Sequence, residues 1–204
     1  MDITGASPIA RPSLTYSVHP SLDQFRVPYK TYLFNIPKDP SKVTFHWIVV
    51  GAAVLDSDNR ILLIQRSAKE FFPNLWEIPG GGCEEDNESV IHTVVRELQE
   101  ETGLLARSVG PMIGDGYHFS VGTDKIACKY NFVVEVDGQI GEQGMIEFHL
   151  DPHEHQNHVW ATEEEVKAGR MAGTELKFTS VEQEQVILEA FELRRRLDDP
   201  SKCG

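Results

Sequence analysis

The sequence has few basic residues for its length. Its 204 residues include 19 Lys and Arg against 32 Asp and Glu, which gives a formal net charge of -13 at pH 7. Binding to DNA or RNA draws most of its affinity from clustered Lys and Arg that neutralise phosphates. We therefore expect no polymeric nucleic acid as a partner, although a small anion held through metal ions is compatible with this charge.

Cysteines and long apolar runs are also scarce. Cys83, Cys128 and Cys203 are widely spaced and form no CxxC pair, so the sequence indicates neither a disulfide framework nor a zinc site. No apolar run approaches the roughly 20 residues of a membrane-spanning helix, and the N-terminus lacks the basic and apolar regions of a signal peptide. We expect a soluble, cytoplasmic protein with no membrane partner.

Proline divides the chain into two parts. Six of the eleven prolines lie in the first 40 residues, and proline interrupts regular elements. We interpret residues 1–42 as a partly irregular N-terminal extension, in which the segment YKTYLFNI forms an added strand and the first dozen residues fray. Residues 43–200 then form the main domain, and dimer formation through the extension is left open.

Several β-rich runs follow the extension. FHWIVVGAAVL and RILLIQR flank the turn segment DSDN, a pattern that predicts a β-hairpin over residues 45–66. YHFSV, KIACKYNFVVEV and a short run at residues 159–160 predict further strands. The segment TSVEQEQVILEAFELRRRL predicts a closing helix with Thr179 as its N-cap. Strands interspersed with two helices predict an α+β fold in which helices cover a mixed sheet.

The segment GCEEDNESVIHTVVRELQEETGL, residues 82–104, holds seven carboxylates and one arginine. Its apolar residues recur at helical spacing, which predicts a helix that starts at Glu88, with Asn87 as N-cap, and ends at Gly103. At about 100° per residue, Glu97, Glu100 and Glu101 share one arc beside the apolar face. Converging carboxylates suit hard divalent cations such as Mg²⁺ or Mn²⁺, and a solvated acidic face is the alternative.

The same segment resembles the Nudix box, G-x5-E-x7-R-E-U-x-E-E-x-G-U, in which U is a bulky aliphatic residue. All nine specified positions are filled, by Gly82, Glu88, Arg96, Glu97, Leu98, Glu100, Glu101, Gly103 and Leu104. The preceding WEIPGG also resembles the usual lead-in to the box. The segment departs from the usual pattern at one point, because PGGG contains an extra glycine before Gly82.

The resemblance implies a Nudix-type α/β/α sandwich and hydrolysis of a diphosphate linked to another moiety, commonly a nucleoside. It implies that Glu97, Glu100 and Glu101, together with Gly82, hold Mg²⁺ or Mn²⁺, and that Gly81 and Gly82 contact the substrate. Arg96 and Glu88 would brace the helix and orient the carboxylates. A glutamate is needed as general base.

Three further assignments come with alternatives. The general base is Glu97 or Glu154, and we favour Glu154 because its place before Trp160 resembles the later loop glutamate of the family. Arg66 could bind a substrate phosphate, or form a surface ion pair. The histidines at positions 149, 153, 155 and 158 favour a loop near the active site over a transition-metal site.

The substrate is left open. The expected partner is a small-molecule diphosphate, either a nucleoside diphosphate derivative or a non-nucleotide compound such as a prenyl diphosphate. Two other functions fit the same scaffold: a diphosphate isomerase, and a sensor module that binds a diphosphate without turnover. The complete R-E-U-x-E-E pattern favours the hydrolase over both.

Overall fold

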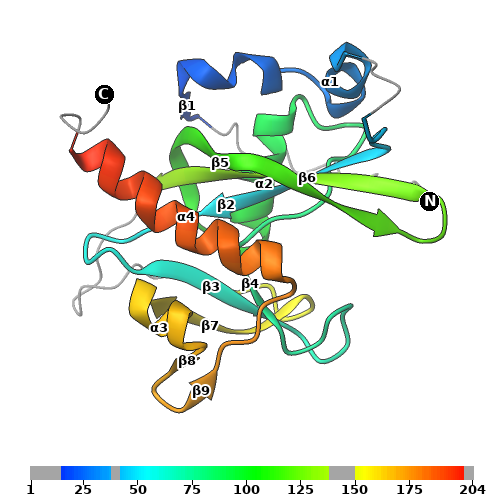
Figure 1. The fold of residues 1–204 in the computed structure, drawn as a ribbon. Coiled ribbons are helices and arrows are strands. Elements are labelled where there is room, and N and C mark those ends of the chain that lie inside the picture. The colour runs from blue at the N-terminus through cyan, green and yellow to red at the C-terminus, as the bar shows by residue number, and fades with distance from the viewer. Residues whose placement is uncertain (1–14, 38–41, 138–149, 200–204) are drawn as a thin grey trace, which may run out of the picture.

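The computed structural model describes residues 15–37, 42–137 and 150–199 (Figure 1). The expected fraying of the first dozen residues, and His149, lie outside these ranges. The elements, in chain order, are β1 (Ser17–Val18), the 3-10 helix η1 (Pro20–Phe25), α1 (Tyr29–Asn35), β2 (Trp47–Ala53), β3 (Ile61–Arg66), β4 (Trp76–Glu77), α2 (Val90–Thr102), β5 (Leu105–Val121), β6 (Lys125–Asp137), β7 (His155–Ala161), α3 (Glu163–Ala168), β8 (Arg170–Met171), β9 (Thr174–Glu175) and α4 (Val181–Asp198).

A mixed sheet forms the centre of the fold. Its strands lie in the order β1-β5-β6-β2, with β5 and β6 antiparallel and with parallel pairs at both edges. Long β5 begins directly after the box helix, well before the strand expected from residue 117. The mixed sheet itself is as expected.

The predicted hairpin over residues 45–66 forms only next to its turn, where Leu62 N donates to Val54 O and Leu55 pairs with Ile61. The turn forms, with Asp56 Oδ1 accepting hydrogen bonds from the backbone N–H groups of Asp58 and Arg60. However, β2 joins the mixed sheet, whereas β3 pairs with β4 and β7 in a second, antiparallel sheet. The reason is that β6 occupies one edge of β2 and the glycine segment occupies the other, through the bond from Val50 N to Gly81 O.

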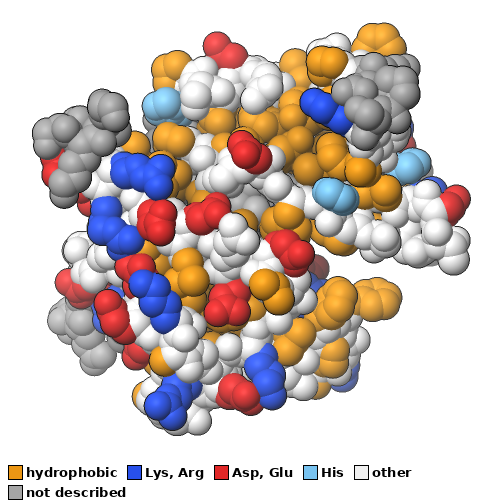
Figure 2. All heavy atoms as spheres, viewed as in Figure 1, with side chains coloured by type: hydrophobic (Ala, Val, Ile, Leu, Met, Phe, Trp, Pro, Cys, Tyr) orange, Lys and Arg blue, Asp and Glu red, His pale blue; other side chains and the backbone are white. Residues whose placement is uncertain are grey.

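Successive side chains of a strand point to opposite faces, and the two faces of the mixed sheet have separate cores. On one face the apolar side of α2 packs in a cluster with residues of β2, β6 and the N-terminal helices. On the other face Ile187 and Phe191 of α4 pack in a second cluster with residues of β3 and β5. Acidic and basic side chains are interspersed over the outer surface of α4 (Figure 2). Among the described helices, none is long and apolar enough to cross a membrane.

The expected strand in YKTYLFNI is wrong, because residues Tyr29–Asn35 form helix α1. Aromatic composition favours a strand, but the apolar positions Tyr29, Tyr32, Leu33 and Ile36 recur at helical spacing. Tyr29 and Tyr32 are buried by this periodicity, in the same core as α2. Burial of one helical face therefore outweighed local β-propensity.

Both helix starts lie later than predicted. α2 begins at Val90, because Ser89 is the N-cap and its side chain accepts from His92 N. Asn87 instead accepts hydrogen bonds from Glu84 N and from the hydroxyl of Thr93, so its side chain holds the preceding turn.

The closing helix α4 also begins later than predicted. Its N-cap is Ser180, whose hydroxyl accepts from Gln183 N. Thr179, the predicted N-cap, donates its backbone N–H to Trp76 O and so belongs to the preceding extended segment.

Candidate active site

Helix α2 presents its carboxylates along the border between core and surface. Its apolar side is buried, with Val94, Val95 and Leu98 fully covered. Of the three box carboxylates, Glu101 is buried, Glu97 is partly buried and Glu100 is exposed. Gly103 ends the helix in the left-handed conformation, at φ 72°, as the sequence predicts.

The glycine segment lies between β2 and α2. Gly80 has a φ of 154°, and a Cβ atom there would lie 2.1 Å from Val50 O. A Cβ atom on Gly81 would lie 2.6 Å from the carboxyl carbon of Glu97. Only glycine permits this close approach, so these residues bring the backbone against the carboxylates of α2.

Arg96 orients two of the box carboxylates. Its guanidinium is buried and donates to Glu97 Oε1 at 2.5 Å, and it also donates to Glu100 Oε2. A longer bond, of 3.4 Å, reaches Gly82 O. Charge-assisted bonds of this kind fix carboxylate positions. Glu88, the other expected brace, is exposed. Burial raises the pKa of Tyr16, and the nearby charge of Glu88 raises it further.

Glu101 is the most buried of the three carboxylates, with 4% of its surface exposed. Burial raises its pKa well above the usual value, and the charge of Glu77 raises it further. A backbone hydrogen bond from Gly80 N to Glu101 Oε2, 2.7 Å long, acts in the opposite direction. A cation beside Glu101 would therefore stabilise its charged form.

The charged form of Glu97 would also be stabilised by a nearby cation. Burial raises its pKa to about 7, although the neighbouring Arg96 guanidinium lowers it. The carboxylates of Glu100 and Glu154 raise it again. Carboxylate oxygens whose charged form lacks compensation are the donor set that Mg²⁺ and Mn²⁺ prefer, so these residues fit a divalent cation.

Three buried residues outside the box border the carboxylates of α2, namely Glu77, Lys129 and His155. Glu77 of β4 is buried, and Arg66 of β3 donates to its Oε1 at 2.6 Å. Burial raises the pKa of Glu77, but His155, the buried Lys129 of β6 and Arg66 outweigh it and hold this pKa at about 2. Glu77 is therefore a paired carboxylate, in contrast to Glu101.

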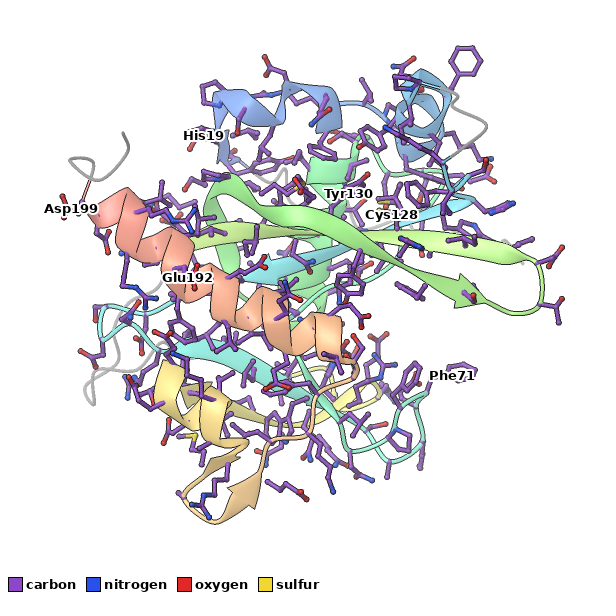
Figure 3. All side chains as sticks on the ribbon, viewed as in Figure 1. His19, Phe71, Cys128, Tyr130, Glu192 and Asp199 are labelled. Atoms are coloured by element: carbon purple, nitrogen blue, oxygen red, sulfur yellow. The ribbon has the colours of Figure 1, made fainter. Side chains whose placement is uncertain are left out.

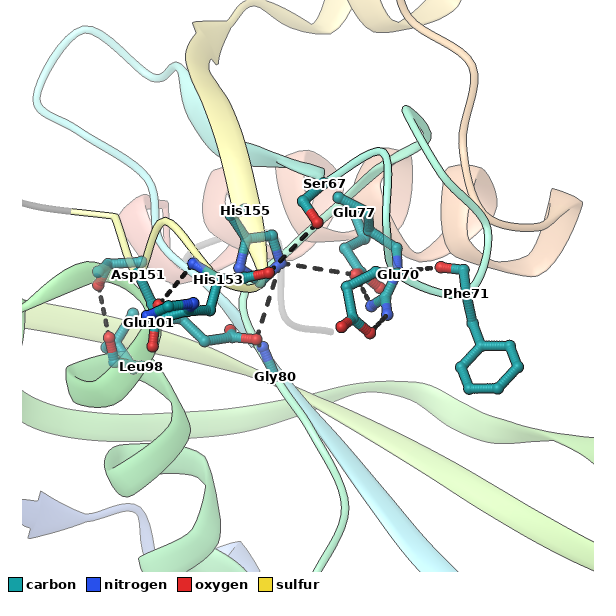
Figure 4. Close-up of polar contacts among 12 residues, drawn as sticks. Ser67, Glu70, Phe71, Glu77, Gly80, Leu98, Glu101, Asp151, His153 and His155 are labelled. Atoms are coloured by element: carbon teal, nitrogen blue, oxygen red, sulfur yellow. Dashed lines mark hydrogen bonds and ion pairs between the residues drawn. The ribbon is translucent and has the colours of Figure 1, made fainter.

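His155 enters the site at the start of β7 (Figure 4), directly after Glu154. His155 Nε2 lies 3.8 Å from both Glu77 Oε1 and Glu101 Oε1. One ligand atom from each of Glu101, Glu154 and His155 lies within 4.8 Å of the others. Backbone bonds fix this approach, because Ser67 N donates to Glu154 O and Asp151 N donates to Glu101 O.

The structure thus brings most of the expected residues together. Glu97, Glu100 and Gly82 gather around Arg96, and Glu154 approaches Glu101. Arg66 lies at the same site but is engaged by Glu77 and Glu70, so the ion-pair alternative describes its present contacts.

Sequence signals existed for two of these three buried residues. Glu77 belongs to the WEIPGG lead-in, and His155 is adjacent to Glu154. His155 and His158 lie in β7 and not in the expected loop, because β7 begins at His155. Lys129 carried no signal, since it lies in an otherwise apolar strand pattern.

A cleft of about 400 Å³ opens beside Glu97. It lies between the start of β2, the glycine segment and the end of the β5–β6 hairpin. Its lining residues are Trp47, Ile48, Val49, Gly82, Cys83, Glu84, Glu97, Val121 and Ala127. The cleft is therefore largely apolar but reaches the carboxylates at one end.

The fold and the site together define a hydrolase of the Nudix class. The model of the NUDIX domain matches residues 45–180, so the chain belongs to the Nudix family. A MutT Nudix hydrolase from Burkholderia pseudomallei has the same fold, with a TM-score of 0.52 at 19% identity over 70% of this chain and 96% of that one.

Curated relatives agree on the reaction class and differ in their substrates. The chain is similar to a CTP pyrophosphohydrolase of Escherichia coli (strain K12), with 37% identity over 58% of this chain and 78% of that protein. It is also similar to an ADP-ribose pyrophosphatase of Methanocaldococcus jannaschii, with 38% identity over 32% of this chain and 38% of that protein. The chain is therefore a pyrophosphohydrolase that acts on phosphorus-containing acid anhydrides.

Proposed function

We propose that this protein hydrolyses the pyrophosphate linkage of a nucleoside diphosphate derivative, or a related small diphosphate, with the help of Mg²⁺ or Mn²⁺. The observation that carries the proposal is the convergence of Glu97, Glu101 and Glu154 beside the glycine segment. The raised pKa values of Glu97 and Glu101 mean that their charged forms need a cation.

Each residue has a distinct role in this proposal. Glu97, Glu100 and Glu101 hold the metal, together with the backbone of Gly82. Arg96 positions Glu97 and Glu100 through its two charge-assisted bonds. When bound, the metal neutralises phosphate oxygens and polarises water.

Glu154 is the proposed general base. Its carboxylate is exposed, at the edge of the cluster with Glu101 and His155, where it can accept a proton from the attacking water. Glu97 is the alternative base, but one of its oxygens is already held by Arg96 at 2.5 Å. Attack of the water on phosphorus then releases the second phosphate group.

A nucleoside is the proposed second moiety of the substrate. The cleft beside Glu97 offers Trp47, Val121 and Ala127 to a flat, weakly polar group such as a nucleobase. A prenyl chain is the alternative occupant of the same apolar lining. Arg66 reaches a substrate phosphate only by leaving Glu77 or Glu70.

The test is release of phosphate or monophosphate from a panel of nucleotide and prenyl diphosphates with Mg²⁺ or Mn²⁺. Glu100→Gln is expected to lose turnover by about a hundredfold while keeping its fold, because it removes a charged metal ligand. Glu164→Gln, an exposed carboxylate of α3, is the matched control and keeps full turnover. Tight binding of a diphosphate without turnover in the wild type would instead indicate the sensor module.

Glu154→Gln tests the general base separately. The amide retains an oxygen that can face a cation but cannot accept a proton, so turnover falls about a hundredfold or more. Binding of Mn²⁺, measured by calorimetry, changes little. Unchanged turnover would remove Glu154 from the mechanism and leave Glu97 as the base.

A further inference from the structure

His155 is a buried imidazole with no hydrogen bond to its ring. Only 2% of the residue is exposed. Within residues 15–37, 42–137 and 150–199, neither Nδ1 nor Nε2 has a hydrogen-bond partner. A buried polar atom left without a partner destabilises the folded state. The ring nitrogens are therefore available to bind a ligand that is not one of those side chains.

The geometry around Nε2 indicates what that group is. Nε2 lies 3.8 Å from Glu101 Oε1, which is too long for a hydrogen bond. Two ligand atoms that share one cation at about 2.1 Å each lie about 3 Å apart when adjacent and about 4.2 Å apart when opposite. The observed separation falls between these values, so both atoms can face one ion.

The contacts of Glu101 also indicate a cation site between its carboxylate and His155. Its Oε2 already accepts from Gly80 N at 2.7 Å, whereas its Oε1 is the atom turned toward His155. Glu77, the other carboxylate beside the ring, is already paired with Arg66 at 2.6 Å. Glu77 thus has a direct ion pair with a guanidinium, whereas Glu101 Oε1 faces the imidazole and the buried Lys129 acts on Glu101 through its charge.

We propose that His155 supplies a nitrogen ligand to the divalent cation held by Glu101, at the point that Glu154 also borders. This inference rests on the proposed metal-dependent function and extends it to the choice of metal. Imidazole nitrogen suits first-row transition ions, whereas Mg²⁺ prefers oxygen ligands and near-ideal octahedral geometry. The site is therefore selective for Mn²⁺ over Mg²⁺.

The first experiment measures the dissociation constants of Mn²⁺ and Mg²⁺ by calorimetry on the full chain. In His155→Gln, the affinity for Mn²⁺ is expected to fall about tenfold or more, while the affinity for Mg²⁺ changes less than about twofold because the amide offers an oxygen ligand. His153→Gln is the matched control, since His153 is exposed in the same segment, and both affinities stay unchanged.

The second experiment detects the ligand directly, and its wild-type measurement does not depend on whether a variant folds. Pulsed electron paramagnetic resonance of bound Mn²⁺ is expected to show coupling to a histidine nitrogen in the wild type. The coupling changes on labelling histidine with ¹⁵N, disappears in His155→Gln and persists in His153→Gln.

The outcomes separate this inference from the proposed function. Mn²⁺ bound without nitrogen coupling, with Mg²⁺-supported turnover intact, overturns the role of His155 and leaves the hydrolase standing. Equal affinities for Mn²⁺ and Mg²⁺ in the wild type overturn the selectivity. No binding of either ion, and no metal-dependent turnover, overturns both proposals.

Discussion

Strand β6 contributes side chains to two regions of opposite character. On one face Tyr130 and Phe132 join Phe25 and Tyr32 in an aromatic cluster, with ring centroids 4.9–5.7 Å apart. Figure 3 shows Tyr130 between the sheet and the N-terminal helices. Lys129 points to the opposite face of the strand. Burial raises the pKa of Glu77, and Lys129, together with His155 and Arg66, lowers it.

The second region is a carboxylate cluster, which consists of Glu77, Glu97, Glu101 and Glu154 with His155. Its members include carboxyls with raised pKa values and an imidazole that has no hydrogen-bond partner among the residues the structure describes. The aromatic cluster, by contrast, buries apolar surface and pairs its two hydroxyls, since Tyr32 Oη donates to Tyr130 Oη at 3.1 Å.

The difference shows where this protein gains stability and where it gives some up. Aromatic pairs contribute beyond their buried area, whereas like charges in a buried site oppose folding. Functional sites break the local rules that the rest of a fold obeys. The N-terminal segment supplies two of the four rings, so it supports the sheet that carries the site.

The largest expected effect is on the aromatic cluster. Phe25→Ala removes a ring that contacts three others, and the free energy of unfolding is expected to fall by about 3–5 kcal/mol. Turnover per folded molecule stays unchanged, because the ring is remote from the carboxylates. Urea denaturation measures the first quantity. Phe34→Ala, at a residue 77% exposed, is the control and costs less than about 0.5 kcal/mol.

The second prediction concerns the carboxylate cluster, where a substitution is expected to raise the free energy of unfolding instead of lowering it. Glu101→Gln keeps the acceptor for Gly80 N but removes a buried carboxyl whose raised pKa opposes folding at neutral pH, so the metal-free protein is expected to gain about 1 kcal/mol of stability. Turnover falls about a hundredfold, because a metal ligand is lost. Denaturation in the presence of a chelator measures the gain. A loss of stability would show that the charge of Glu101 is already compensated in the metal-free protein.

The smallest effect tests the polar contact inside the aromatic cluster. Tyr32→Phe removes the hydroxyl that donates to Tyr130, at a cost of about 1 kcal/mol. A double-mutant cycle with Tyr130→Phe isolates the coupling, and the double variant is expected to be less destabilised than the sum of the two single variants. Strict additivity would mean that the two hydroxyls do not interact.

Short-range features of this protein were predictable from the sequence. The box helix, its end at Gly103 and the stripe of Glu97, Glu100 and Glu101 follow from a period of 3.6 residues. The two helix starts were predicted within two residues, since several polar residues near each start can serve as the cap. The class of reaction followed from the box, and the comparison with the family confirms it.

Strand pairing between distant segments was harder to predict from the sequence. The predicted hairpin forms only next to its turn, because the edges of β2 are filled by β6 and the glycine segment, which lie far along the chain. The strand predicted in YKTYLFNI failed because the core beneath α1 selects a helical face. Local propensity is weak against such burial.

The sequence by itself determined the chemistry of this protein, because a helix places residues three and four apart on one side whatever surrounds it. Only the tertiary structure decided what meets that side. Glu77, Lys129 and His155 come from three different strands, and their contacts with Glu101 depend on how two sheets pack against one helix. Burial then sets the pKa values of the carboxylates, and burial is a property of the whole fold.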